Sequence, residues 1–257
     1  MRVATFNCNS VRARLPIIGD WLAAQEPDIL CLQETKVQDR DFPESAFTAA
    51  GYRVSFRGQK GYNGVAIVSK SAPADVRFGL DDGGEPDEPR LACAEIDGVH
   101  VVNTYVPQGT DPESPKFQYK LAWLDRLRGF FERHFTPQQP VLWTGDLNVA
   151  PTPIDVFDHD RLLGHVCHHP DEFAALATCL DWGFTDVFRK HCPEPNQFTF
   201  FDYRLPKSVD RGLGWRIDHI LATPPLAERS TGAFIDLEPR RRAKPSDHTF
   251  LVADFDL

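Results

Sequence analysis

Short apolar runs recur along the whole chain, and they constrain the fold more than any other feature of the sequence. Many contain β-branched or aromatic residues and end near Gly, Pro, Asn or Asp, which is typical of strands. We expect strands at residues 2–6, 28–32, 52–56, 64–68, 91–96 and 100–105, a strand that starts at 141, and strands at 215–222, 232–237 and 248–255.

Turn and helix signals between these runs indicate the fold class. An Asp-Gly pair at 97–98 predicts a β-hairpin. Apolar residues in 116–134 recur at the spacing of one helix face, and segments 11–25 and 172–182 have helical patterns as well. The mixture predicts an α+β fold in which two β-sheets pack face to face with helices outside.

A single domain over residues 1–257 is the simplest organisation. No repeat and no long linker rich in Gly and Ser divides the chain, and 42% hydrophobic residues suffice for a sizeable core. The first ten residues lack the apolar region of a signal peptide, and no window holds the ~20 apolar residues of a membrane-spanning helix. We therefore expect a cytoplasmic monomer with no membrane partner.

Six cysteines are scattered through the chain, and none forms a CxxC pair. Cys8, Cys31 and Cys93 lie in apolar runs, where we expect them to act as small core residues. Residues 165–169 (HVCHH) include ligand-type side chains, but no second cluster lies at zinc-site spacing. We expect a solvated loop there, with a metal site as the alternative.

The net charge of −9 argues against a nucleic-acid partner unless the acidic residues are segregated. Residues 81–88 hold five acids and no base, and four more carboxylates belong to the candidate site described below. Without these residues the chain is neutral, so the composition allows a basic face. The densest basic run is 240–244 (RRRAK), just before one of the site motifs.

Polar side chains stand where the predicted strands end. Each alone is more often a turn former, a solvated charge or a packing residue. In the segment WTGDLNVAP, Gly145 allows close backbone approach, and Asp146 and Asn148 are expected to face one side because residues two apart on a strand do so. The whole set combines acids, amides, a phenol and an imidazole: Asn7, Glu34, Tyr105, Asp146, Asn148, Asp218, Asp247 and His248.

These groups suit metal-dependent hydrolysis of a phosphate ester. Carboxylates such as Glu34 and Asp247, with amide oxygens, are ligands that Mg²⁺ and Mn²⁺ prefer. An unpaired Asp near the metal can take a proton from water. His, Tyr and Asn side chains can stabilise the negative charge of a five-coordinate phosphorus. The residues by themselves therefore indicate a phosphoester hydrolase.

Eight segments resemble the exonuclease III branch of the endonuclease/exonuclease/phosphatase superfamily, which also contains the apurinic/apyrimidinic (AP) endonucleases. Their order and number are far more specific than any one motif. The segments are ATFNCNSVRAR (4–14), PDILCLQETK (27–36), GYNGVAIVSK (61–70), NTYVPQG (103–109), WTGDLNVAP (143–151), TFFDYR (199–204), GWRIDHIL (214–221) and PSDHTFLVADF (245–255).

The resemblance implies a four-layer α/β sandwich with its site at the edge where the strands end. It implies double-stranded DNA, abasic or blocked at a 3′ end, as the substrate, and in a bacterium an association with the nucleoid. The implied activities are AP-site incision, 3′→5′ exonuclease and removal of 3′ blocks. Mg²⁺ is the implied cofactor, with Mn²⁺ as a substitute, and the implied metal ligands are Asn7, Glu34 and Asp247.

The resemblance also implies a role for each remaining strand-end residue. Asp146 would activate the attacking water, and Tyr105 and Asn148 would hold phosphate oxygens. His248 would bind the scissile phosphate while Asp218 keeps it charged and oriented.

An apolar slot for a base-free sugar separates this branch from the phosphatases and sphingomyelinases of the superfamily. Phe200, Trp215 and Ile217 match the residues that form this slot in AP endonucleases, and the slot would exclude an intact nucleotide. Ordinary core packing is the alternative for these residues, and we favour it for Phe201.

The chain departs from the branch at two positions. Exonuclease III enzymes commonly have Trp where this chain has Phe200, and animal-type enzymes have an acid where it has Asn9. These differences leave open the balance between AP-site incision and exonuclease digestion, and the second can change the metal preference.

Contacts to DNA are expected on backbone phosphates, because repair of damage cannot depend on sequence. Two candidates carry amides and the others are Lys or Arg, each of which is about as well explained as a solvated surface residue. The candidates are Asn9, Lys36, Arg90, Gln108, Lys116, Arg211 and Lys244.

Two other hypotheses remain at this stage. One is a phosphatase of small molecules or lipid head groups on the same fold. The other is a DNA-binding or scaffold protein without catalysis, which is disfavoured because every catalytic position matches the branch.

Overall fold

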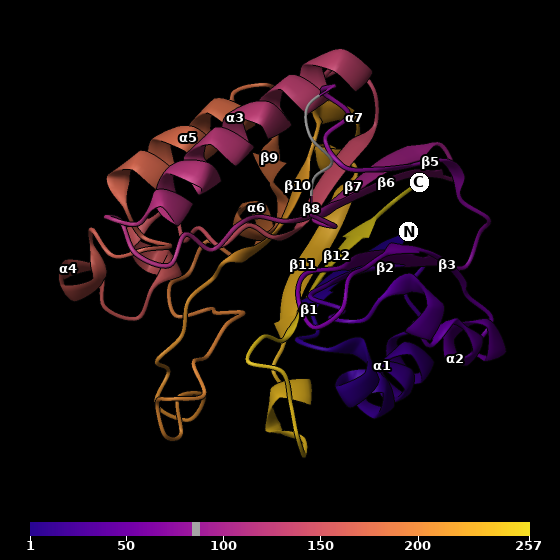
Figure 1. Cartoon of the computed structure of the whole chain (residues 1–257), viewed down its shortest axis with the longest axis horizontal. Coiled ribbons are helices and arrows are strands. Elements are labelled where there is room, and N and C mark those ends of the chain that lie inside the picture. The colour runs from indigo at the N-terminus through magenta and orange to yellow at the C-terminus, as the bar shows by residue number, and fades with distance from the viewer. Residues whose placement is uncertain (84–87) are drawn as a thin grey trace.

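The computed structural model describes residues 1–83 and 88–257, so part of the acidic segment 81–88 lies outside the described residues. Two six-stranded sheets pack against each other, and helices cover their outer faces, which gives four layers (Figure 1). The expected α+β sandwich of two mixed sheets flanked by helices is confirmed.

The first sheet has the strand order β11-β12-β1-β2-β4-β3. Strands β1 and β2 run parallel, and all other neighbours in this sheet are antiparallel. The strands are β1 (Arg2–Asn7), β2 (Ile29–Gln33), β3 (Arg53–Arg57), β4 (Val65–Ser69), β11 (Ser230–Asp236) and β12 (Phe250–Phe255).

The second sheet has the order β5-β6-β7-β8-β10-β9 and also contains one parallel pair, β7 and β8. Its other neighbours are antiparallel, including the predicted hairpin of β6 and β7. The strands are β5 (Ala74–Phe78), β6 (Leu91–Ile96), β7 (Val99–Tyr105), β8 (Val141–Asp146), β9 (Thr185–Asp186) and β10 (Asp218–Ala222).

The long helices form the two outer layers (Figure 1). Helices α1 (Val11–Gln25) and α2 (Glu44–Ala49) cover the first sheet, and α3 (Pro115–His134) and α5 (Pro170–Leu180) cover the second. The short elements α4 (His159–Leu162), α6 (Val187–His191), α7 (Pro224–Ala227), η1 (Asp39–Asp41), η2 (Pro153–Asp155) and η3 (Pro239–Arg241) lie in the connections.

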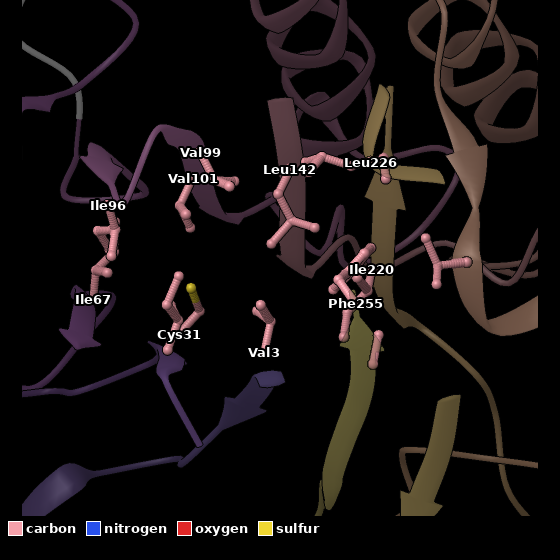
Figure 2. Packing of buried hydrophobic residues seen from close by; sticks show 14 of the residues in the cluster. Val3, Cys31, Ile67, Ile96, Val99, Val101, Leu142, Ile220, Leu226 and Phe255 are labelled. Carbon is pink, nitrogen blue, oxygen red and sulfur yellow. The ribbon is translucent and has the colours of Figure 1, made fainter. Parts of the chain in front are cut away.

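The central core lies between the two sheets, as Figure 2 shows for Val3, Cys31 and Leu142. Successive strand residues alternate between faces, so Val3 enters this core while Ala4 and Phe6 pack beneath α1. Burial on both faces explains why the central strands are continuous apolar runs rather than alternating ones.

Most predicted elements are confirmed within a few residues, and the exceptions have local causes. The predicted strand 215–222 begins only at Asp218, because Trp215 instead forms single bridges with Val156 and Phe200. Strand β5 was not predicted, because this largely exposed edge strand has no apolar run. Cys8, Cys31 and Cys93 are buried, which confirms their expected packing role.

Candidate active site

The two parallel strand pairs place four of the predicted residues at one edge of the sandwich. Asn7 ends β1, and Glu34 directly follows β2, its parallel neighbour. In the second sheet Tyr105 and Asp146 end β7 and β8 and are register partners. The carboxyl ends of parallel neighbours lie at the same edge, so the topology itself gathers these side chains.

The remaining residues lie at or just before the starts of antiparallel strands, which places them at the same edge. Asp218 begins β10 and pairs with Asp146, the last residue of β8. Asp247 and His248 lie just before β12, which runs antiparallel to β1.

Gly145 allows β7 and β8 to approach closely, as the sequence predicted. A Cβ atom at this position would lie 2.0 Å from the Thr104 carbonyl oxygen, and the φ angle of +135° is one that L side chains rarely adopt. The Tyr105–Asp146 register therefore depends on the absence of a side chain at 145.

Asn148 reaches the site through a turn and not along a strand, which corrects the expectation for the Asp-x-Asn pair. Strand β8 ends at Asp146, and Asn148 has a left-handed φ of 51°. Its backbone N–H donates to Asp146 Oδ1 at 2.9 Å, and its Nδ2 donates to the Val106 carbonyl at 3.0 Å. The turn and the site role are thus compatible, because the turn fixes both side chains.

Asn7 connects the acidic groups of the two sheets. Its Nδ2 donates to Glu34 Oε1 at 2.9 Å and to Asp146 Oδ2 at 2.8 Å. The Asn7 side chain is fully buried, so it fixes the orientation of both carboxylates from the protein interior. Burial raises the pKa of Asp146 to about 7, with nearby Asp218 adding to the rise and His248 opposing it.

His248 lies between two carboxylates. Its Nδ1–H donates to Asp218 Oδ2 at 2.8 Å, and its Nε2 lies 3.7 Å from Asp146 Oδ2. Burial disfavours charge on the imidazole, but Asp218 and Asp146 outweigh burial and raise the pKa of His248 to about 10. The geometry therefore supports a protonated His248 that faces the site.

A second polar chain surrounds Glu34. Lys36 Nζ lies 2.6 Å from Glu34 Oε2 and donates to Asn9 Oδ1 at 2.6 Å, while Asn9 Nδ2 donates to Asp247 Oδ1 at 3.0 Å. Asn9, Glu34 and Lys36 all have φ between 44° and 53°. Left-handed backbone at several non-glycine residues is a strain that clusters at functional sites.

The donor chemistry of the site fits a hard divalent cation. Glu34 and Asp247 supply carboxylate oxygens, which are the ligand type that Mg²⁺ takes, whereas the predicted ligand Asn7 turns its Nδ2 toward Glu34 and accepts the Asn9 backbone N–H at 3.0 Å with its amide oxygen. In the described part of the chain, Asp146, Asp218 and His248 also form a group whose ligand atoms lie within 4.8 Å of one another. The raised pKa of His248 keeps both of its ring nitrogens protonated, so neither can bind a metal, and we favour the Glu34 side for a cation.

Tyr105 is kept in its neutral form. Burial and the nearby carboxylates of Glu34 and Asp146 raise the pKa of its hydroxyl above the ordinary value. The Arg90 guanidinium lies 4.8 Å from the ring centroid and donates to the Tyr105 carbonyl at 3.3 Å. Arg90 also pairs with Glu88 at 2.7 Å, so this predicted DNA-contact residue supports Tyr105 in the structure.

A pocket of about 280 Å³ lies in front of these groups. Phe200, Trp215 and Ile217 form its apolar side, and the Phe200 ring centroid is 5.0 Å from that of His248. Phe201 is 2% exposed and belongs to the interior, as expected. The predicted residues that line the pocket are Glu34, Tyr105, Gln108, Asp146, Asn148, Phe200, Trp215, Ile217, Asp247 and His248.

Four pocket residues were not predicted: Val166, Cys167, Asp202 and Arg204. The expectation of a solvated loop at 165–169 is wrong for Cys167 and His168, which are buried. His168 bonds to the Ala150 carbonyl through Nδ1, which draws the loop against the segment after Asn148. The sequence signal that was available is the Cys residue itself, since free Cys is among the most buried residue types.

The predicted DNA-contact residues occupy different surroundings. Gln108 lines both the pocket and an adjoining groove that contains Arg90 and Lys116. Asn9 and Lys36 belong to the chain around Glu34, as described above. Arg211 lies on an exposed loop and does not line the pocket.

None of the helices in the described residues combines the length and the apolar character that crossing a bilayer requires.

Comparisons with known proteins identify the family of the chain. Residues 4–248 match the Endonuclease/Exonuclease/phosphatase family. Exodeoxyribonuclease III of Haemophilus influenzae is 35% identical over 267 aligned positions, which cover 99% of this chain and 100% of that protein.

Two solved structures are similar over their whole length. An AP endonuclease from Archaeoglobus fulgidus is 50% identical with a TM-score of 0.97, and the alignment covers 100% of each chain. A 3′ phosphatase from Neisseria, bound to a product DNA hairpin, is 38% identical with a TM-score of 0.97 and the same coverage. The chain therefore belongs to the endonuclease/exonuclease/phosphatase family, within its exonuclease III and AP endonuclease branch, which is a group of hydrolytic nucleases.

Proposed function

We propose that this protein is a Mg²⁺-dependent DNA repair nuclease that hydrolyses phosphodiesters at abasic sites and removes nucleotides or blocking groups at 3′ ends. One observation carries the proposal. The buried Asp146 carboxylate, held by Asn7 and faced by His248, lies beside an apolar slot formed by Phe200 and Trp215. The relatives include an exodeoxyribonuclease, an AP endonuclease and a 3′ phosphatase.

Asp146 acts as the base that takes a proton from the attacking water. Asn7 holds one of its oxygens and the Asn148 backbone N–H holds the other, so the carboxylate keeps one orientation. With a pKa of about 7 it is ionised above neutral pH and still basic enough to accept a proton.

Three donors receive the phosphate. Protonated His248 contributes a positive charge, and Asp218 fixes the ring by its bond to Nδ1. The neutral Tyr105 hydroxyl and the Asn148 amide add hydrogen bonds where negative charge develops at phosphorus. A Mg²⁺ or Mn²⁺ ion held by Glu34, Asp247 and Asn7 would supply further neutralisation of phosphate charge.

The slot accounts for substrate choice. Phe200, Trp215 and Ile217 offer an apolar surface next to His248, which suits a deoxyribose without its base.

Basic residues on two contacting loops fit the electrostatic requirement for DNA. Arg240 packs over the Tyr203 ring at 5.1 Å, and Arg241 pairs with Asp210 at 3.3 Å. These contacts join the loop 202–213 to the basic run 240–244, and both project from the same side of the sandwich (Figure 1). The overall net charge of −9 therefore does not exclude a DNA partner.

A substrate panel tests the proposal. We take the protein to act as a single-domain monomer. It is incubated separately with a duplex that contains one tetrahydrofuran abasic analogue, with a nicked duplex that ends in a 3′-phosphate, and with a soluble inositol phosphate. Each reaction is run with Mg²⁺ and with EDTA. We expect Mg²⁺-dependent turnover of both DNA substrates and little of the inositol phosphate. Turnover of the inositol phosphate alone would establish the phosphatase alternative, and turnover of none would refute a catalytic role.

A further inference from the structure

Lys120 on α3 is a fully buried charge next to the site. Its side chain has 0% exposure, as does that of Glu172 on α5, and its Nζ lies 2.5 Å from Glu172 Oε1. Lysine is almost never fully buried unless it is paired, so this ammonium has a specific structural task.

The other two contacts of Lys120 indicate that task. Its Nζ donates to the backbone carbonyl of Asn148 at 2.6 Å and to that of Gln108 at 3.3 Å. Together with Glu172 these acceptors use all three donors of the ammonium group. Asn148 and Gln108 belong to the loops that follow β8 and β7, so one buried cation joins the loop that carries Asn148 to the loop that follows Tyr105.

Glu172 extends the connection to a third wall of the pocket. Its Oε1 accepts the Cys167 backbone N–H at 3.1 Å, and its Oε2 accepts the His169 backbone N–H at 3.1 Å. Cys167 lines the pocket with a left-handed φ of 71°. The ion pair therefore contacts three of the loops that line the pocket.

We propose that Lys120 is a positioning residue for phosphodiester hydrolysis, which acts by fixing the strained turn at Asn148 against the loop at Gln108. The inference rests on the proposed function, because it concerns the same site. Asn148 is held at a φ of 51°, and its amide must meet the phosphate in one orientation. A small displacement of such a donor lowers turnover more than binding.

Helix packing alone does not explain the pair. Two apolar side chains of similar volume would join α3 and α5 as well, and replacing a buried ion pair in this way is often neutral or stabilising. The carbonyl contacts of Lys120 would be lost in that exchange, and they are what the positioning role requires.

The test removes the charge without leaving a buried carboxylate unpaired. The double variant Lys120→Met/Glu172→Gln is compared with Leu127→Ala, which truncates a buried residue of the same helix away from the site. For incision of a tetrahydrofuran duplex we expect kcat to fall at least about tenfold in the double variant, with KM changed less than about threefold. Leu127→Ala should lower the melting temperature and keep kcat.

A double-mutant cycle that combines these changes with Asn148→Gly tests whether Lys120 acts through Asn148. Glycine accepts the left-handed φ, so this change removes the side chain and keeps the turn. In the Asn148→Gly background the double variant should reduce kcat by less than about threefold, because residues that act as a unit are not additive. Independent, multiplicative losses would overturn the proposal, as would a wild-type kcat in the double variant.

A second pair of changes keeps the inference testable if the methionine variant does not fold. Lys120→Gln/Glu172→Gln retains an N–H donor for the carbonyls, so its kcat should lie closer to that of the wild type than the kcat of the Lys120→Met/Glu172→Gln variant does. If the methionine variant is unfolded, the kcat of the glutamine variant should lie within about tenfold of wild type. A folded glutamine variant with a larger kcat loss would refute the role. A wild-type protein that does not incise the duplex would refute the proposed function instead.

Discussion

The Asp218→Asn substitution tests the electrostatics of the site most specifically. The amide fits the same space, but it removes the negative charge that lies 2.8 Å from His248 Nδ1. In the wild type His248 has a pKa of about 10, because Asp218 and Asp146 outweigh the effect of burial. Asp146 has a pKa of about 7, so between pH 7 and pH 10 the base is ionised while the imidazole is charged.

The size of the effect follows from these values. If the substitution only returned His248 to its ordinary pKa of 6.5, about 3% of the imidazole would carry a proton at pH 8. Burial lowers that fraction and the retained Asp146 carboxylate raises it, so the ordinary pKa serves as the reference value. We therefore expect incision at pH 8 to fall about 30-fold, with a loss that grows about tenfold for each pH unit above 7.

The assay is single-turnover incision of a tetrahydrofuran duplex with Mg²⁺ between pH 6 and pH 9. The wild-type rate should rise through pH 7 and then stay level, whereas the Asp218→Asn rate should decline above pH 7. A ratio of the two rates that is constant across this range would show that Asp218 has a structural role only, and it would refute the reasoning.

Three further predictions concern stability and specificity. Burial alone would raise the pKa of Asp155, but Arg216, whose Nε is 2.7 Å away, lowers it. The ion pair therefore stabilises the fold fully above about pH 4 and loses this effect on further acidification. Asp155→Asn should lower the free energy of unfolding by about 3–5 kcal/mol at pH 7, and urea unfolding of the variant should depend less on pH below about pH 4. Gly145→Ala should cost at least about 2 kcal/mol in thermal unfolding and reduce incision, because the new Cβ would overlap the Thr104 carbonyl; an unchanged melting temperature would contradict this. Trp215→Ala should lower the ratio of incision at an abasic analogue to digestion of intact DNA by about tenfold, and an unchanged ratio would remove the slot from the account.

Sequence patterns predict which strand ends carry the candidate site. Each apolar run predicts where a strand ends, and strand ends gather at sheet edges, so the sequence predicts that Glu34, Tyr105 and Asp146 lie at one edge. The parallel pairing of β1 with β2 and of β7 with β8 then explains why those ends coincide. The hydrogen bond that joins Asn7 to Asp146 crosses 139 positions of sequence, and no local pattern encodes it.

The periodicity of α3 contains a signal for the burial of Lys120. It lies three residues after Phe117 and four before Leu124, on the apolar face of α3, and a lysine there conflicts with the helix pattern. Cys167 was missed for another reason. Its backbone N–H donates to the carboxylate of Glu172 and its Sγ contacts the Asn148 side chain, and both are tertiary contacts.

The most direct test of the central claim compares wild-type protein with Asp146→Ala under single-turnover conditions. The substrate is a duplex with one tetrahydrofuran residue in Mg²⁺, and binding is measured in parallel with Ca²⁺ in place of Mg²⁺. We predict that the variant binds the duplex within about tenfold of wild type and incises it at least about 1000-fold more slowly, because the base is gone while the phosphate donors remain. Incision at a wild-type rate by Asp146→Ala would contradict the assignment of the base and the mechanism built on it.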